Sequence, residues 1–184
     1  MARRLRNTSI AFAVALAVAV PAAAGPRAAS SRFHLTSSTI TLGRSIGNLK
    51  IGMTIAQVAA YLGPGQLLNS RHKGVVSFYQ YGNPSSGSYT ALFAGHPRIA
   101  VNIGEHTGVM HTPEGIRLGS TLAQLEAAYP QLQCETGLRE AQPESATGFC
   151  DLHQPRGRAT RFGLTHGEVD VIGVARSAYI SQLR

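Results

Sequence analysis

One stretch of this chain occurs twice. Residues 49–62 (LKIGMTIAQVAAYL) align without a gap on residues 116–129 (IRLGSTLAQLEAAY), 67 positions later. The identical pairs are Gly52/Gly119, Thr54/Thr121, Ala56/Ala123, Gln57/Gln124 and Ala60/Ala127. Self-similarity at a fixed spacing is typical of a supersecondary unit that a fold uses more than once. The sequence therefore predicts two related modules in tandem.

Each copy of the repeat carries the signature of a helix start. Thr54 and Thr121 stand at the expected N-caps, and Gln57 and Gln124 follow three residues later. A threonine and a glutamine at this spacing can satisfy each other's free backbone N–H groups as a capping box. A glycine lies two positions before each N-cap, where the chain has to bend. Because a proline follows each repeat closely, both helices are expected to be about two turns long.

Segments with strand character follow each predicted helix. They are residues 74–81, 89–93, 98–103, 148–153, 159–165 and 168–176, separated by clusters of Gly, Asn, Pro and Ser. Residues 33–42 also alternate apolar with Ser or Thr and could add an edge strand. Runs of strands with helices confined to a few places favour the α+β class. We expect an antiparallel sheet with the helices packed on one of its faces.

The N-terminus has the features of a secretory signal peptide. Arg3, Arg4 and Arg6 precede an apolar run over residues 10–20, and an Ala-rich exit ends near Ala24. The apolar run is 11 residues long, whereas a membrane span needs roughly 20. We therefore expect residues 1–24 to direct export and to be cleaved near Ala24. The alternative is an uncleaved N-terminal anchor.

The repeat and the leader together suggest boundaries along the chain. Residues 25–43 would form a disordered lead or an edge strand, residues 44–104 the first module, residues 105–112 a linker and residues 113–184 the second module. The two modules would make one compact domain. No later segment is apolar over a length that could cross a bilayer, so no membrane span is expected after cleavage.

The charge of the chain is basic but dispersed. There are 17 Lys and Arg against nine Asp and Glu, and three of the arginines lie in the expected leader. The mature chain would then carry a net charge of +5. Its tightest basic group, residues 156–161 (RGRATR), is more typical of a solvated loop than of a phosphate-binding stripe. Nucleic acid is therefore not an expected partner.

The two cysteines, Cys134 and Cys150, are expected to form a disulfide. An even number of cysteines in an exported chain is typical of a structural bridge, because the compartment is oxidising. A loop of about 15 residues closed in this way gains roughly 3 kcal/mol in the chain-entropy model. The alternative, a redox pair, is disfavoured because the spacing is unlike Cys-x-x-Cys.

The motifs of common enzymes are missing from the sequence. It has no Gly-x-Ser-x-Gly, no Ser-x-x-Lys and no Gly-rich loop with phosphate-binding spacing. Glu105, His106 and His111 form the one suggestive histidine group, but their spacing matches no strong metal motif and favours a polar linker. We therefore expect no catalytic residue, no metal and no cofactor.

The repeated segments Ile51–Val58 and Leu118–Leu125 resemble the Gly-Met-Thr-x-x-Gln-Val modules of the β-lactamase-inhibitor-protein-like fold. They are also similar to the small outer-membrane-assembly lipoproteins of the SmpA/OmlA type. The resemblance covers about residues 44–176, and Cys134 and Cys150 sit where the inhibitor-like modules place a disulfide. Since no cysteine near the cleavage site could accept a lipid, the chain looks more like the secreted two-module proteins of actinobacterial type. The resemblance implies a bare sheet face offered to a protein partner.

Tyr79 and Tyr81 are the predicted contact residues on such a face. On residues 74–81 the period of two places these tyrosines on one side of the strand, with Val76 and Phe78 on the other. If the helices cover Val76 and Phe78, both tyrosines stand on the open face, where Tyr is enriched at recognition surfaces. The alternative is that they are half-buried sheet residues.

These observations favour an exported, non-enzymatic binding protein with a protein, peptide or envelope component as its partner. The rival hypothesis is a secreted hydrolase that acts on an extracellular polymer through groups which converge only in the fold, such as Asp170, Glu168 and His166. A third possibility is a wall-associated spacer without a specific partner. The sequence leaves the ligand and the oligomeric state open.

Overall fold

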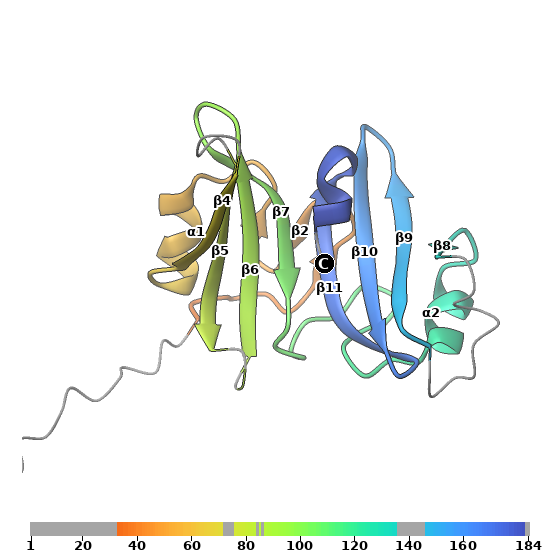
Figure 1. Cartoon of the computed structure of the whole chain (residues 1–184). Helices are drawn as coiled ribbons and strands as arrows, with labels where there is room; N and C mark the ends of the chain where they lie inside the picture. The colour runs from red at the N-terminus through yellow and green to blue at the C-terminus, as the bar shows by residue number, and fades with distance from the viewer. Residues whose placement is uncertain (1–32, 72–75, 84, 86, 136–145, 183–184) are drawn as a thin grey trace, which may run out of the picture. The chain divides into compact units, whose positions relative to one another are not determined.

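A large antiparallel sheet organises the chain, as the computed structural model shows (Figure 1). The structure describes residues 33–71, 76–83, 85, 87–135 and 146–182. The expected signal peptide, with its cleavage site, lies outside these residues. Among the described residues, eight strands form the large sheet in the spatial order β4-β5-β6-β7-β11-β10-β9-β8. The strands are β4 (Gln66–Arg71), β5 (Val76–Asn83), β6 (Gly87–Ala94), β7 (Ile99–Glu105), β8 (Gln133–Cys134), β9 (Gly148–Gln154), β10 (Arg158–Thr165) and β11 (Glu168–Arg176).

The remaining elements lie around this sheet. A small three-stranded sheet consists of β1 (Ile40–Thr41), β2 (Ser45–Ile46) and β3 (Leu49–Lys50). The α-helices are α1 (Ile55–Leu62) and α2 (Leu122–Ala128), and the 3₁₀ helix η2 (Ser177–Gln182) follows the last strand. The α+β class is therefore confirmed, with an antiparallel sheet as its main component.

The order of the strands places the last strand of each half of the sequence at the centre. β7 pairs antiparallel with β11 through four residue pairs, from Asn102↔Ala175 to Glu105↔Ile172. From this seam the strands β6, β5 and β4 follow on one side, and β10, β9 and β8 follow on the other. Each half therefore runs from an outer edge of the sheet to its middle (Figure 1).

The two helix starts are attached to the central strands by matching backbone hydrogen bonds. The N–H of Gly52 donates to Ala100 on β7 (2.8 Å), and the N–H of Gly119 donates to Val169 on β11 (2.8 Å). In return, Ala100 donates to the carbonyl of Met53 (2.7 Å), and Val169 donates to that of Ser120 (2.8 Å). Both glycines have a positive φ, 101° and 82°, a conformation that favours glycine.

Both helices begin with the complete capping box. Thr54 donates its backbone N–H to Gln57 Oε1 (2.8 Å), and its hydroxyl oxygen accepts from the N–H of Gln57 (3.3 Å). Thr121 and Gln124 repeat this pattern with distances of 2.9 and 3.3 Å. A helix of eight or seven residues has too few internal hydrogen bonds to be stable alone, so these caps and the packing beneath them position it.

One face of the large sheet carries the main core. Val58 and Leu62 of α1 and Leu125 of α2 belong to the same buried cluster as side chains from β5, β6, β7, β9, β10 and β11. The largest fully buried members of this cluster from the sheet are Tyr81, Tyr89, Phe93, Ile103, Leu152 and Phe162. We call this side the core face and the opposite side the open face.

The prediction that Tyr81 stands on the open face is wrong. Its side chain is fully buried in the core cluster, and Tyr79 is partly buried against the same cluster. Val76 and Phe78 instead point to the open face. On the core face the chain passes closely over the Tyr81 ring, since a Cβ atom on Gly65 would lie 2.5 Å from it. Tyr81 is therefore a core residue and cannot contact a partner.

The segment expected as an edge strand also has a different place. Within residues 33–42 only Ile40–Thr41 forms a strand, and it pairs in the small sheet rather than at an edge of the large one. The N–H of Ile40 donates to the carbonyl of His111 (2.7 Å), and the Ile40 side chain is fully buried. The segment is therefore held by the linker between the halves.

Candidate functional site

The open face is partly covered by the C-terminal 3₁₀ helix. Ile180 packs with Ala159 and Ala175 in a small buried cluster, and the carbonyl of Tyr179 accepts a hydrogen bond from Asn102 Nδ2 (3.3 Å). Figure 1 shows η2 lying in front of the upper part of β10 and β11. No residue of η2 lines the end of the face near His106, which follows β7, and Thr165 on β10.

A trough of about 330 Å³ lies on this uncovered part of the open face. It receives residues from β5, β6, β11, β10 and β9, and from both sides of the central seam. It is lined by Phe78, Thr90, His106, Thr147, Gly148, Phe149, Gly163, Leu164, Thr165, Asp170 and Val171. A volume near the lower end of the range for small-molecule sites, about 300 to 1,000 Å³, suits a ligand group rather than a whole protein surface.

The floor of the trough depends on a glycine. A Cβ atom on Gly163 of β10 would lie 2.4 Å from Cγ1 of Val171 on β11. Any larger residue would push these strands apart or displace Val171 into the trough. The pairing of β10 and β11 also shifts register next to this glycine, between Gly163 and Leu164, and such bulges are common beside functional sites.

One wall of the trough is reinforced by a buried ion pair. The guanidinium of Arg161 lies 4.7 Å from the centre of the Phe149 ring, a cation–π distance. Its Nε and Nη2 donate to the two carboxylate oxygens of Asp151, each at 2.8 Å. Arg161 Nη1 is buried and has no hydrogen-bond partner among the described residues. The aromatic wall is therefore fixed in position by its charged neighbours.

The rim of the trough is polar at the seam between the halves. His106 follows β7, and Asp170 lies on β11, where it accepts a hydrogen bond from the Thr165 hydroxyl (2.6 Å). Partial burial lowers the pKa of His106, while the Asp170 carboxylate acts in the opposite direction. At neutral pH the imidazole is therefore mostly uncharged.

The residues proposed for a hydrolase do not come together in this trough. Asp170 lines it, but His166 lies exposed in the turn after β10, with φ = 53°. Glu168 is exposed at the start of β11 and bridges to Thr121 through its backbone. The sequence gives no sign that His106 lies near Asp170, because the fold brings together residues that are about 65 positions apart in the chain.

Glu105, one of the three residues singled out in the sequence with His106 and His111, has a structural role in the fold. Glu105 is fully buried, and its Oε1 accepts hydrogen bonds from the N–H groups of Thr107 (2.8 Å) and Gly108 (2.7 Å) and from the Thr107 hydroxyl. Its Oε2 has no partner among the described residues. Burial raises the pKa of Glu105, although these hydrogen bonds oppose the change. The carboxyl group thus fixes the turn that leaves β7.

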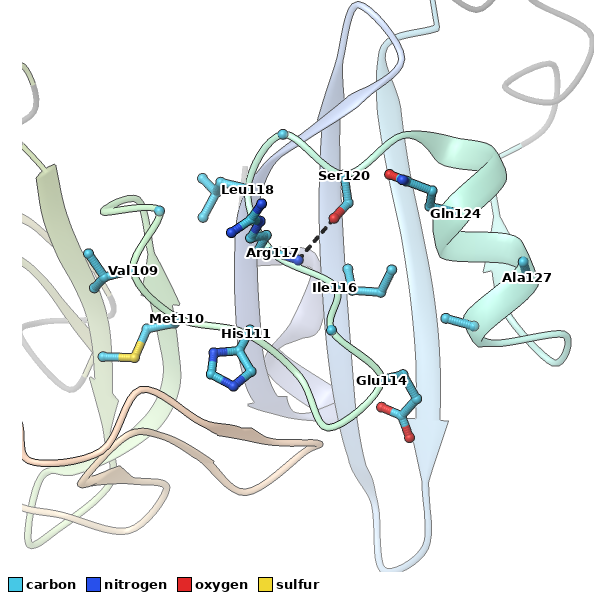
Figure 2. Close-up of a pocket in the computed structure, with 14 residues that line it drawn as sticks. Val109, Met110, His111, Glu114, Ile116, Arg117, Leu118, Ser120, Gln124 and Ala127 are labelled. Carbon is cyan, nitrogen blue, oxygen red and sulfur yellow. Dashed lines mark hydrogen bonds between the residues drawn. The ribbon is translucent and has the colours of Figure 1, made fainter.

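A wider hollow of about 1,010 Å³ lies beside α2 (Figure 2). Most of its polar side chains already have partners within the chain. Glu114 accepts from the Tyr129 hydroxyl, Gln124 accepts from the N-cap of α2, and Ser120 accepts from the N–H of Arg117 (3.1 Å). This hollow is larger than the trough, but the surface that lines the trough is more apolar and so better suited to an apolar group. We therefore take the trough as the candidate site.

The disulfide is confirmed and lies at the edge beside the trough. Cys134 on β8 is bonded to Cys150, directly opposite on β9. Because Phe149 precedes Cys150, the bridge also fixes the strand that carries the aromatic wall.

In the described part of the chain, no helix is long and apolar enough to cross a membrane.

The comparisons with known proteins concern the fold. No family model and no curated protein matches the chain. A structure of an extracellular protein containing a SCP domain, from Bacillus anthracis str. Ames, aligns with a TM-score of 0.52 and 11% identity over 72% of this chain. This chain spans 46% of that protein. The uncharacterized protein yfeY from Escherichia coli aligns with a TM-score of 0.45 and 14% identity, over 77% of this chain and 99% of its own.

Proposed function

We propose that this chain is an exported, non-enzymatic binding protein that uses the trough on its open face to hold an apolar group of a protein, peptide or envelope component. The observation that carries this proposal is the trough itself. A concave, largely apolar site with a few polar groups at its rim is the usual form of a binding pocket. The partner's group would lie against Phe78, Phe149 and Val171.

The arrangement of the chain into two modules is part of the proposal. Matching backbone hydrogen bonds and capping boxes at the two helix starts support a duplicated unit. In this interpretation the trough lies across the boundary of the modules, so that neither could form it alone. A resemblance to the β-lactamase-inhibitor-protein-like fold would agree with a sheet face that serves recognition.

Export is supported by the disulfide, which fits an oxidising compartment, and by the character of the first 24 residues. The absence of an enzyme motif in the sequence is consistent with a binding role. The trough contains one carboxylate and one histidine at its rim, and the other groups proposed for hydrolysis lie outside it. A binding role for this chain therefore needs fewer assumptions than a catalytic role.

The proposal is tested by filling the trough. The mature chain, residues 25–184, is immobilised and used to select from a displayed peptide library and to retain solubilised envelope material. Thr90→Trp places a large side chain in the trough, and His153→Trp is the matched control, because His153 is exposed on β9 and is not among the lining residues. We expect selected ligands to bind the wild type and His153→Trp alike, and Thr90→Trp at least about tenfold more weakly. Equal binding to all three proteins would remove the trough as the site.

A further inference from the structure

The outer edge of the large sheet at β4 is open and apolar. Every residue from Gln66 to Ser70 is exposed, and no strand lies beyond β4 in the sheet described. Leu67 and Leu68 are 51% and 45% exposed. Among the described residues, Val109 is the one other large apolar residue that is exposed. An edge strand of this kind offers unpaired N–H and C=O groups to another strand.

The opposite edge of the sheet is built differently. β8 has two residues, and a disulfide attaches it to β9 through Cys134 and Cys150. Such a short strand offers few free groups for pairing. A head-to-tail assembly would need β4 of one copy to pair with β8 of the next, which would use only two residues. Among the described strands, β4 is therefore the edge that can pair over a useful length.

The occupant that fits β4 best is β4 of a second copy. Two identical strands related by a two-fold axis run antiparallel, and dimers of this symmetry are the commonest oligomers. With the axis between Leu68 and Asn69, Leu67 faces Ser70 of the other copy and Leu68 faces Asn69 of the other copy. These four residues are uncharged, so the pairing places no like charges opposite each other.

We propose that two copies of this chain associate through β4, which extends the large sheet across both molecules. A β-bulge between Leu67 and Asn69 interrupts the pairing of β4 with β5, and a bulge in an edge strand weakens its pairing with a further strand. A single pair of six-residue strands buries an area at the small end of protein interfaces, below about 1,200 Å². The dimer is therefore weak and depends on concentration.

The net charge of the chain also affects the stability of this dimer. With a formal net charge of +8 for the full sequence, and a positive charge also for the mature chain, two copies repel each other at low ionic strength. Salt screens this repulsion, whereas it would weaken an interface made of ion pairs. Association through β4 should therefore become tighter as the salt concentration rises.

Sedimentation equilibrium of the mature chain tests the proposal, over protein concentrations on the order of 10 µM to 1 mM, the range suited to a small interface. We expect a monomer–dimer equilibrium that Leu68→Lys weakens by at least about tenfold, because a lysine on each copy then lies at the paired edge. Val109→Lys is the matched control, since Val109 is 63% exposed and lies in the linker. It should leave the equilibrium unchanged.

A second measurement keeps the test independent of the folding of Leu68→Lys. Leu68→Cys is treated with a short bifunctional thiol reagent, with Val109→Cys as its control. A covalent dimer that forms with Leu68→Cys and not with Val109→Cys supports pairing at β4. A monomer at every concentration, a dimer that Leu68→Lys leaves unchanged, or equal cross-linking of the two cysteine variants would overturn the proposal.

Discussion

Asp151 and Arg161 form a two-point ion pair on the open face, with Nε and Nη2 of the arginine each 2.8 Å from a carboxylate oxygen. The Arg161 side chain is 8% exposed and that of Asp151 is 18% exposed. Solvent therefore screens this pair less than an ordinary surface salt bridge. The pair also fixes the ring of Phe149, which lies under the guanidinium.

Removal of the carboxylate should destabilise the protein strongly. Asp151→Ala leaves the Arg161 guanidinium buried without its partner, and we expect the free energy of unfolding to fall by about 3 kcal/mol. Urea unfolding monitored by circular dichroism measures the change. Glu168→Ala removes an exposed carboxylate on β11 and should cost less than about 0.5 kcal/mol. If both variants had the same stability, the ion pair would have no structural role.

Loss of either capping box should lower the free energy of unfolding by the same amount. Thr54→Ala and Thr121→Ala each remove a hydroxyl that accepts from the N–H of the residue three positions later, and each should reduce stability by about 1 kcal/mol. Since the two sites lie in different halves of the sheet, their effects should add. Thermal unfolding of the two single variants and the double variant measures this. Thr→Ser at either site retains the hydroxyl and should restore most of the loss; clearly unequal costs would argue against equivalent helix starts.

The buried tyrosines should make the protein sensitive to alkaline pH. Burial raises the pKa of Tyr81 and of Tyr89 from 10.0 to about 12. The folded state thus favours the neutral phenols, so their contribution to stability is complete below pH 10 and is lost as the pH rises toward 12. Ultraviolet titration should show tyrosines that ionise late. Tyr81→Phe should reduce the fall in stability between pH 10 and 12, and an unchanged slope would place Tyr81 in solvent.

Glu105 should oppose folding more as the pH rises from acid to neutral. Its folded-state pKa is raised from 4.5, so the charged form is disfavoured in the folded state and stability declines above the unfolded pKa. Glu105→Gln keeps an oxygen for Thr107 and Gly108 but cannot ionise. The difference in unfolding free energy, wild type minus variant, should therefore fall between pH 4 and pH 7 in urea titrations. A difference independent of pH would mean that Glu105 titrates normally.

The repeat and the alternating segments predicted most of the elements that lie within the sheet. The N-caps at Thr54 and Thr121 coincide with the observed helix starts, and β9 to β11 lie within a residue or so of the expected strands. β4 was not predicted, because Gln66–Arg71 has two adjacent leucines and then polar residues, with no alternation. Its pairing with β5 determines its structure, and pairing between distant residues leaves no local pattern.

The candidate site was less accessible to sequence reasoning. β5 carries apolar residues on both faces, so periodicity separated Tyr79 and Tyr81 from Val76 and Phe78 without showing which side faces the core. In the fold, Tyr81 lies in the core cluster, where Gly65 passes close to its ring. The trough also depends on the pairing of β7 with β11, which joins residues near 104 to residues near 173. A local pattern contains no information about such a pair.

The position of β11 at the centre of the sheet has a consequence for biogenesis. β7 pairs with β6 on one side, but its other side finds its neighbour only when residues 172–175 are available, some 70 residues later in the sequence. A chain that crosses a membrane unfolded, N-terminus first, would therefore keep this side of β7 unpaired until residues 172–175 have crossed. Contacts between such distant residues form slowly and leave strand edges exposed meanwhile. Maturation of this protein should thus depend on whatever protects a half-emerged chain from aggregation.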